Sequence, residues 1–288
     1  MGTLYVVGTP IGNLEDMTLR AIRILREVRL IAAEDTRSAR VLLAHFDIHT
    51  PVTSFFEHNQ RARLASVLEA LAIGDVALIS EAGMPGLSDP GYLLVREAIT
   101  AGYPVVPIPG PTAAIAALIV SGLPSDRFLF LGFPPRRAAE RQRWLADVAR
   151  EPGTLVLYEA PHRLCATLAD VVAVLGDRQV AVAEELTKRF ESVWRGEASA
   201  ALAHFTAHPP RGEFTLVIAG ASAPGAEEAW PRARLEEAVD LFAAEGIAPA
   251  TAARLLGRLT GLSRRELYQL ILTRQADARE EERQPFTD

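Results

Sequence analysis

Short apolar stretches and helical patterns alternate through the first 121 residues, and this alternation constrains the fold more than any other feature. Apolar runs rich in β-branched residues occur at Leu4–Val7, Leu30–Ala33, Val52–Phe55, Val76–Ser80 and Val105–Ile108. Helix-like patterns lie between and after them, at Thr18–Val28, Ser38–Phe46, Asn59–Ile73, Gly91–Ala101 and Pro111–Ser121. Such alternation favours an open, largely parallel sheet with helices on both faces, so we predict an α/β fold.

A second series of the same kind follows a linker-like segment at Gly122–Asp126. Its predicted strands are Phe128–Phe133, Thr154–Tyr158, Gln179–Glu184 and Phe214–Ala219, and its predicted helices are Ala138–Arg150, Leu164–Leu175 and Ala198–Ala207. We therefore predict two consecutive α/β domains, at residues 1–121 and 122–222.

The end of the chain has a different composition. Ala221–Glu228 is rich in Ala, Gly, Pro and Ser, which indicates a hinge. Apolar residues then recur at helical spacing, and Ser263 to Glu266 form a capping-box pattern that opens a third helix. We predict a small helical bundle with helix-turn-helix character at residues 229–276, followed by a frayed tail.

Composition narrows the classes of function. The chain has 288 residues, of which 49% are apolar, and a formal net charge of −6. This charge argues against a general nucleic-acid binder but leaves room for local basic patches. The single cysteine, Cys165, fits a reducing compartment, and neither a secretory signal nor a transmembrane stretch is visible. We expect a cytoplasmic protein that does not contact a membrane.

Four loops follow predicted strands of the first domain, where ligands of open α/β sheets bind. They are Gly8–Asn13, Glu34–Arg37, Ser80–Gly91 and Pro109–Ala114. The first is not a G-x-G-x-x-G dinucleotide loop. Each also has a plainer interpretation as a turn or a helix start, but the length and the Gly and Pro content of the third favour a ligand loop.

Two loops of the second domain carry further polar residues. Tyr158–Arg163 and Glu184–Arg189 follow strands, whereas Gly212-Glu213 precedes one. No cluster has metal-ligand spacing, and no nucleophile elbow, P-loop or H-E-x-x-H pattern occurs. We therefore expect no metal site.

Six of these segments, in this order, resemble one family. LYVVGTPIGNL, AEDTR, SEAGMPGLSDPG, IPGPTA, YEAPHR and ELTKRFE are similar to the motifs of the bacterial 16S rRNA (cytidine-2′-O)-methyltransferase I family, within the tetrapyrrole-methylase, or class III, methyltransferases. The resemblance runs from Leu4 to Ala219, and the C-terminal bundle also fits. It implies two α/β domains with S-adenosylmethionine (SAM) bound between them, a homodimer, and methylation of the ribose of cytidine 1402 in 16S rRNA of the small ribosomal subunit.

The resemblance also implies a set of cofactor-binding residues: Pro10, Glu81, Ala82, Gly83, Met84, Pro85, Thr112, Ala113, Tyr158 and Leu186. The family more often has D-A-G-T-P where this chain has E-A-G-M-P at residues 81–85. The two differences are Glu81 in place of Asp and Met84 in place of Thr. A contact made by the backbone would tolerate both departures, at Glu81 and at Met84.

Transfer of a methyl group to a hydroxyl benefits from a base, and three residues are candidates. Lys188 is the only lysine among 30 basic residues, and a coding bias toward arginine is the main explanation. The one lysine that remains would suit a role that needs an ammonium able to lose its proton. Glu159 and Glu184 are the other candidates, because both stand at strand ends. Binding of a phosphate is a nearly equal alternative for Lys188.

An acidic protein that binds RNA needs a local basic surface. The candidate residues are Asn13, Arg37, Arg136, Arg137, Arg141, Arg143, His162 and Arg163. A solvated helix surface is the alternative for the arginine cluster. The C-terminal bundle adds Arg254, Arg258, Arg264 and Arg265 as a second possible contact with rRNA.

Two other functions remain open from the sequence. One is a tetrapyrrole-precursor methyltransferase of the same superfamily, which would need neither the arginine cluster nor the C-terminal bundle. The other is a non-enzymatic DNA-binding regulator that uses the helix-turn-helix-like end, which the net charge and the elaborate loops oppose.

Overall fold

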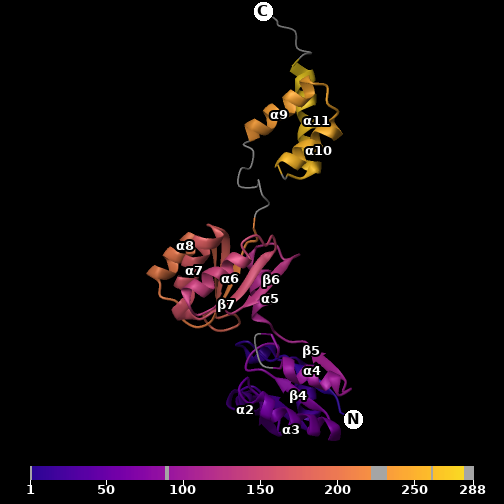
Figure 1. Cartoon of the computed structure of the whole chain (residues 1–288), viewed down its shortest axis with the longest axis vertical. Helices are drawn as coiled ribbons and strands as arrows, with labels where there is room; N and C mark the ends of the chain where they lie inside the picture. Colours follow the sequence, from indigo (N-terminus) through magenta and orange to yellow (C-terminus); the bar gives the residue numbers. More distant parts are fainter. Residues whose placement is uncertain (1, 88–90, 222–231, 261, 282–288) are drawn as a thin grey trace, which may run out of the picture. The chain divides into compact units, whose positions relative to one another are not determined.

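The computed structural model describes residues 2–87, 91–221, 232–260 and 262–281. The chain divides into two compact units, Met1–Gly220 and Ala221–Asp288 (Figure 1). The first unit contains two sheets with helices, and the second is helical. Most of the hinge predicted at residues 221–228, residues 88–90 near the end of the glycine-rich loop, and the end of the tail lie outside the described residues.

The first sheet is parallel throughout, as predicted. Its strands are β1 (Leu4–Val7), β2 (Leu30–Ala33), β3 (Val52–Ser54), β4 (Val76–Ile79) and β5 (Val105–Ile108), in the order β3-β2-β4-β1-β5. Nearly every residue of β1, β2 and β4 is buried, because helices cover both faces. Because β4, β1 and β5 are parallel neighbours, the loops that follow them all leave the sheet at the same edge.

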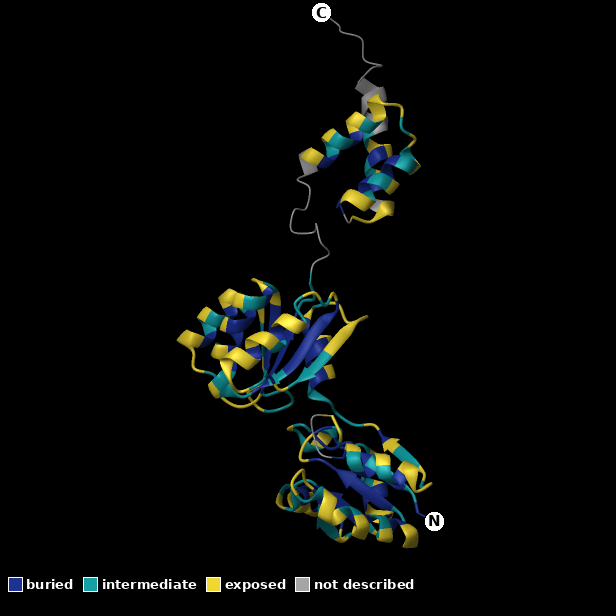
Figure 2. Cartoon of the chain, in the orientation of Figure 1, coloured by how far each residue is buried: buried dark blue, intermediate teal, exposed yellow. Residues whose placement is uncertain are grey.

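Two pairs of helices cover the two faces of this sheet. The helices α1 (Leu19–Glu27) and α2 (Thr36–His45) pack on one face through residues such as Leu25 and Leu43. On the other face lie α3 (Gln60–Ile73) and α4 (Tyr92–Thr100), with a separate apolar cluster. A short 3-10 turn, η1 (Leu14–Asp16), follows the first loop. Figure 2 shows the buried strands enclosed by helices whose outer sides are exposed.

The second sheet is mixed. Its strands are β6 (Phe128–Gly132), β7 (Thr154–Glu159), β8 (Gln179–Glu184), β9 (Ser192–Glu197) and β10 (Phe214–Ile218), in the order β6-β7-β10-β8-β9. Only the pair β6–β7 is parallel, and β10 runs antiparallel to both of its neighbours, β7 and β8. The edge strand β9 was not predicted, because its residues alternate between exposed and half-buried and include none that is buried.

Helices again cover both faces of the second sheet. The helices α6 (Ala138–Asp147), α7 (Pro161–Leu175) and α8 (Ala198–Ala207) pack on one face. The other face is covered by α5 (Ala113–Ser121), whose Ala117 and Leu118 contact the second sheet. The limits 1–121, 122–222 and 229–276 stay predictions, and the packing of α5 would move the first limit to a position before this helix.

The second unit contains the predicted helical bundle. Its helices are α9 (Arg232–Ala244), α10 (Pro249–Thr260) and α11 (Arg264–Glu281). They enclose a small apolar core made by Leu235, Val239, Ala252, Ala253, Leu256, Leu267 and Ile271. Across the described residues, no helix is long and apolar enough to cross a membrane.

Candidate functional site

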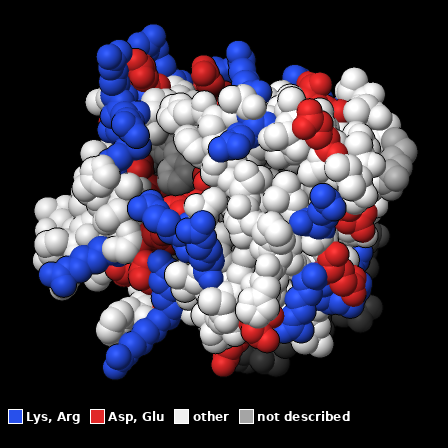
Figure 3. Space-filling view, turned by 90° about the horizontal axis from the view of Figure 1, so that it is seen from below, with Lys and Arg blue, Asp and Glu red and all other residues white. Residues whose placement is uncertain are grey.

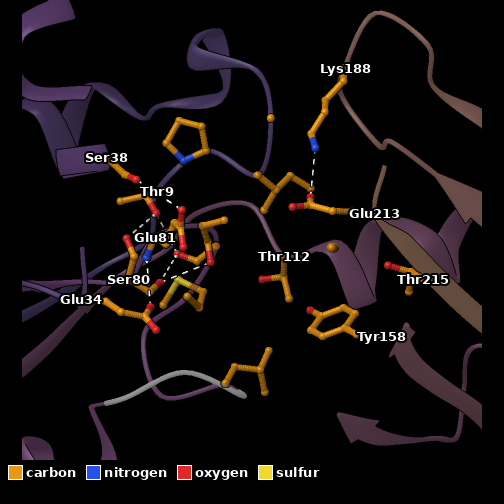
Figure 4. Close-up of a pocket in the computed structure, with 18 of the residues that line it drawn as sticks. Thr9, Glu34, Ser38, Ser80, Glu81, Thr112, Tyr158, Lys188, Glu213 and Thr215 are labelled. Atoms are coloured by element: carbon orange, nitrogen blue, oxygen red, sulfur yellow. Dashed lines mark hydrogen bonds and ion pairs between the residues drawn. The ribbon is translucent and has the colours of Figure 1, made fainter. Parts of the chain in front are cut away.

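A cleft of about 760 Å³ lies in the first unit, where loops from both sheets meet (Figure 4). The first sheet contributes the loops after β1, β2, β4 and β5, and the second contributes the end of β7, the loop after β8 and the start of β10. Clefts at the carboxyl ends of parallel strands are the usual ligand sites of such sheets. The fold therefore forms the cleft where the sequence predicted it.

Backbone contacts join the loops on the first-sheet side of the cleft. Thr9 and Gly83 exchange two backbone hydrogen bonds, of 2.9 and 3.1 Å, which tie the loop after β1 to the loop after β4. Gly8 and Gly110 approach so closely that a Cβ on Gly8 would lie 2.7 Å from the Gly110 Cα. The wall of the cleft is therefore largely backbone, and Gly83 has a φ of +78°, which favours glycine.

Two carboxylates lie close together in this wall. Ser38 Oγ donates to Glu81 Oε1 at 3.3 Å, and the backbone N–H of Glu81 donates to Glu34 Oε2 at 3.2 Å. Burial raises the pKa of the Glu34 carboxyl, and the nearby charges of Glu81 and Asp35 add to this, against the backbone hydrogen bond from Glu81. This part of the cleft suits a cationic group of a ligand.

Aromatic side chains form part of the second-sheet side. Tyr158 and Phe133 both line the cleft, with their ring centroids 5.4 Å apart. The Tyr158 hydroxyl accepts a hydrogen bond of 3.3 Å from the backbone N–H of Ala114, at the start of α5. Thr112, directly before α5, lies beside Tyr158 (Figure 4). The rings are tilted by 56° to one another, so each offers its own face to a planar ligand group.

The carboxylates of two of the three base candidates already accept hydrogen bonds from neighbouring groups. Glu159 is 2% exposed and accepts hydrogen bonds from Thr167 Oγ1 at 2.5 Å and from the Ala160 backbone at 2.8 Å. Its Oε1 also lies 3.3 Å from Arg163 Nε. Glu184 is half-buried, accepts from Ser192 Oγ at 3.2 Å, and does not line the cleft.

Lys188, the third candidate, lines the cleft and is held by two carboxylates. Its Nζ lies 2.9 Å from Glu185 Oε1 and 3.0 Å from Glu213 Oε2. Burial lowers the pKa of the Lys188 ammonium, but the hydrogen bonds to Glu185 and Glu213 outweigh this, so that the net pKa is raised above its usual value. Lys188 is therefore protonated at neutral pH in this conformation, which favours the role of a cation over that of a base.

Most of the predicted cofactor residues line the cleft. These are Pro10, Glu81, Ala82, Gly83, Met84, Thr112, Ala113 and Tyr158. Pro85 is not among the lining residues, and Leu186 packs against the apolar cluster beneath α5. The role of each residue in cofactor binding stays a prediction. The structure does bring the loops that contain these residues together at one cleft.

The residues predicted to contact RNA fall into two groups. Arg141 is 5% exposed, with its guanidinium 2.6 Å from Asp170 Oδ2, and Arg163 donates to the carbonyls of Pro134 and Pro135. Both therefore support the fold from the interior, and we keep neither in the RNA surface. The other cluster members are exposed: Arg136, Arg137, Arg143 and His162.

The two candidates on the first domain also have local partners. Asn13 accepts from the Glu15 backbone and caps η1. Arg37 forms an ion pair with Asp35 at 3.0 Å, and the hydrogen bond from Arg37 lowers the pKa of the Asp35 carboxyl. The Arg37 side chain is still 88% exposed, so it remains accessible to a ligand.

Sequence reasoning did not select two acidic residues of the cleft, Glu34 and Glu213. Glu34 lies in the predicted loop Glu34–Arg37, where its residue type alone does not distinguish it from its charged neighbours. Glu213 was set aside because it precedes a strand, whereas ligand loops of parallel sheets follow strands. Since β10 is antiparallel to β7 and β8, the start of β10 lies beside their ends, and Glu213 reaches the cleft.

Comparison with known proteins gives consistent matches. The family model described as Tetrapyrrole (Corrin/Porphyrin) Methylases matches residues 3–202. Ribosomal RNA small subunit methyltransferase I of Synechocystis sp. is 50% identical over 279 residues, covering 96% of this chain and 100% of that protein. The protein of the same name from Thermotoga maritima is 47% identical over 221 residues, covering 76% of this chain and 99% of that protein.

Solved structures share the fold of the first unit at low sequence identity. The uroporphyrin-III C-methyltransferase of Thermus thermophilus, in complex with S-adenosyl homocysteine, is 21% identical and superposes with a TM-score of 0.53. The match covers 75% of this chain and 97% of that one.

Proposed function

The chain belongs to the tetrapyrrole (corrin/porphyrin) methylase family and is a SAM-dependent methyltransferase, and from this premise we propose that its methyl acceptor is the 2′-hydroxyl of cytidine 1402 in 16S rRNA. The observation that carries this proposal is the identity of 50% with a ribosomal RNA small subunit methyltransferase I along the whole of that protein. A tetrapyrrole-precursor methylase shares the fold, but the identity to the solved example is only 21%.

The cleft has the size and chemistry that SAM requires. Its volume of about 760 Å³ lies in the range of small-molecule sites. Backbone around Gly83 allows close approach, Tyr158 and Phe133 offer a surface for a purine ring, and Glu34 with Glu81 would favour the positive charges of the ligand. When bound, SAM supplies a methyl group activated by its sulfonium. The residues of the cleft would hold the acceptor oxygen in line with that methyl group, which contributes much of the acceleration.

We propose that RNA contacts the exposed arginines near the start of α6. Arg136, Arg137 and Arg143 are exposed there, with His162 at the start of α7. In the face drawn in Figure 3, carboxylates lie in a hollow and Lys and Arg side chains stand at its rim. Phosphates would bind the rim, since their affinity comes mainly from basic side chains. This arrangement accommodates RNA on a chain whose net charge is −6.

We also propose a cytoplasmic homodimer. Ile115 and Ile119 on α5, together with Phe128 on the edge strand β6, are large apolar side chains that remain exposed. Apolar groups of this kind on neighbouring elements are typical of interfaces between subunits. Sedimentation of the purified protein would give the mass of two chains if this is correct, and of one chain if it is not.

The acceptor class is tested by incubating the protein with tritiated SAM and three substrates: unmethylated small ribosomal subunits, duplex DNA and a cyclic tetrapyrrole precursor. We expect label only in the ribosomal RNA. Label in the tetrapyrrole alone would replace the proposed acceptor. Specific binding of duplex DNA, without SAM binding or methyl transfer, would favour the DNA-binding regulator.

A further inference from the structure

Four carboxylates lie where β7, β8 and β10 meet. Among the described contacts, only one of the four both lines the cleft and has an oxygen that accepts no hydrogen bond. The register pairs Phe214 with both Glu159 and Glu184, so the start of β10 lies between these two strand ends. Glu185 follows β8, and Glu213 directly precedes β10. Each of these four carboxylates is a candidate for the base that takes the proton of the methyl acceptor.

Three of the four carboxylates already serve the fold. Both oxygens of Glu159 accept hydrogen bonds in the interior, and Glu184 accepts one from Ser192 at the edge of the sheet. Glu185 Oε1 accepts from Lys188 Nζ at 2.9 Å and from the Glu213 backbone N–H at 2.9 Å. Neither Glu184 nor Glu185 lines the cleft, and Glu159 has no exposed side-chain surface.

Glu213 differs in each of these respects. Its side chain is 77% exposed and lines the cleft, opposite Thr112 and Tyr158 in Figure 4. Its Oε2 lies 3.0 Å from Lys188 Nζ, while no hydrogen bond to its Oε1 is found among the described residues. The carboxylate thus has one oxygen fixed by an ammonium and the other free to accept a proton.

The backbone around Glu213 is built to hold this position. Gly212 has a φ of +77°, and a Cβ there would lie 2.3 Å from Glu185 Oε1. Only glycine leaves room for the Glu185 carboxylate, which in turn accepts from the backbone N–H of Glu213. Glu185 has itself a φ of +50°, a conformation that L-residues adopt rarely. Local strain of this kind persists where the surrounding contacts fix it, as they do at functional sites.

We propose that Glu213 accepts the proton of the acceptor 2′-hydroxyl, with Lys188 as the cation that stabilises the negative charge on the reacting oxygen. This rests on the proposed function. A lone pair of the 2′-oxygen forms the new O–C bond, while the S–C bond breaks and its electron pair stays on sulfur, which becomes neutral. The proton of the hydroxyl goes to Glu213 Oε1 and then to water. No further reactant is needed.

The assignment gives Lys188 a role that matches its surroundings. Between two carboxylates the Lys188 amine stays protonated and cannot act as a base, but the ammonium lies within reach of an anionic oxygen that approaches Glu213. Lys188 also packs closely on the first loop, since a Cβ on Gly12 would lie 2.6 Å from Lys188 Cγ. The pair Lys188–Glu213 would therefore face ligands held by that loop.

The test compares Glu213→Gln with Glu184→Gln in the full-length protein. The amide that Glu213→Gln introduces keeps the shape of the side chain and can still accept from Lys188, but it cannot take a proton. We expect kcat to fall on the order of 10²- to 10⁴-fold in Glu213→Gln, while the Kd values for SAM and for small subunits stay unchanged. Glu184→Gln should keep nearly all activity.

A pH profile and a direct readout at Lys188 separate catalysis from positioning. The rate of Glu213→Gln should rise with pH as hydroxide replaces the lost base, whereas the wild-type rate should level off. Because Lys188 is the only lysine, ¹³C-methylation of amines labels it alone besides the N-terminus, and its pKa should fall in Glu213→Gln. If the wild-type protein labels RNA and Glu213→Gln keeps nearly the same kcat, the inference is wrong. Absence of RNA labelling by the wild type would instead overturn the proposed function.

Discussion

Lys188 is the only lysine in the sequence, and its two carboxylate partners decide what it can do. Its isolation among arginines predicted an ammonium able to lose its proton, whereas in the structure Lys188 lines the cleft with a raised pKa. Its charge state could not be predicted, because Glu185 and Glu213 are brought to it by a turn and by an antiparallel strand. Composition identifies an unusual residue, but the pKa depends on neighbours that only the fold supplies.

The first prediction concerns the pH range in which this cluster stabilises the fold. The raised pKa of Lys188 means that its contribution is complete below the ordinary value of 10.5 and is lost as the pH rises through the folded-state value. The hydrogen bond from Lys188 lowers the pKa of Glu185, so the Glu185 contribution is present above 4.5 and is lost as the pH falls through the lowered value.

Lys188→Met should therefore lower the free energy of unfolding by at most about 1 kcal/mol, since the ion pairs are partly exposed. Urea denaturation at a series of pH values measures the difference from the wild type. It should be constant between these two pKa values and shrink on either side. A difference that grows in strongly alkaline solution would contradict the assignment.

The second prediction separates the two kinds of arginine in the cluster after β6. Arg141 is buried against Asp170, so Arg141→Ala leaves a buried carboxylate without its cationic partner and should cost about 3–5 kcal/mol of unfolding free energy. Arg143 is exposed on the same helix, and Arg143→Ala should change stability by less than about 0.5 kcal/mol.

Chemical denaturation measures the stability of both variants, and titration with small subunits at several salt concentrations measures RNA binding. Arg143→Ala should weaken binding of the small subunit and reduce its salt dependence. Equal stability of the two variants would show that the Arg141–Asp170 contact contributes nothing to the fold.

At the scale of elements, periodicity predicted the first sheet almost completely and the second only in part. Buried parallel strands are continuous apolar runs, which are easily recognised, and the observed limits differ from the predicted ones by a few residues. The exposed edge strand β9 carries no such run and was missed. The direction of β10 was also invisible, because a strand pattern does not say which end faces a ligand.

The third prediction concerns the contact between the loops after β1 and β5. Gly8→Ala would place a methyl group 2.7 Å from the Gly110 Cα and equally close to Met84 Sδ, so the loops must move apart. We expect the affinity for SAM to fall about tenfold or more, which corresponds to at least about 1.4 kcal/mol. Calorimetric titration with SAM measures this directly.

Gly122→Ala is the matched control. Gly122 ends α5 with a φ of +81°, and a Cβ there would contact nothing within 4 Å. The substitution should cost about 1 kcal/mol of stability through backbone strain and leave SAM affinity unchanged. A loss of affinity in both variants would mean that general destabilisation, and not the loop contact, is responsible.

At the scale of the whole molecule, the chain consists of two units with separate cores. The sequence predicted a helical unit at the end of the chain, and the apolar core of α9, α10 and α11 confirms it. Its function is not evident from its fold, since small helical bundles serve many purposes. The Thermotoga maritima relative matches 99% of its own length to only 76% of this chain, so a shorter chain of this kind exists.

The fourth prediction follows from this division. Deletion of residues 221–288 should leave the affinity for SAM unchanged, because every residue that lines the cleft lies in the first unit. Binding of small ribosomal subunits should weaken, because Arg254, Arg258, Arg264 and Arg265 are exposed on the deleted unit. Calorimetry with SAM and filter binding with subunits measure the two effects, and loss of SAM binding in a folded truncated protein would contradict the division of roles.

The acceptor atom is central to the proposed function, and one measurement identifies it. Unmethylated small ribosomal subunits are incubated with the protein and SAM that carries a trideuterated methyl group, and the 16S rRNA is digested and analysed by mass spectrometry. We expect one trideuteromethyl group, on the ribose of cytidine 1402, and its loss in Glu213→Gln. Deuterium on a base, on another nucleotide or on protein alone would contradict the proposed 2′-O-methylation.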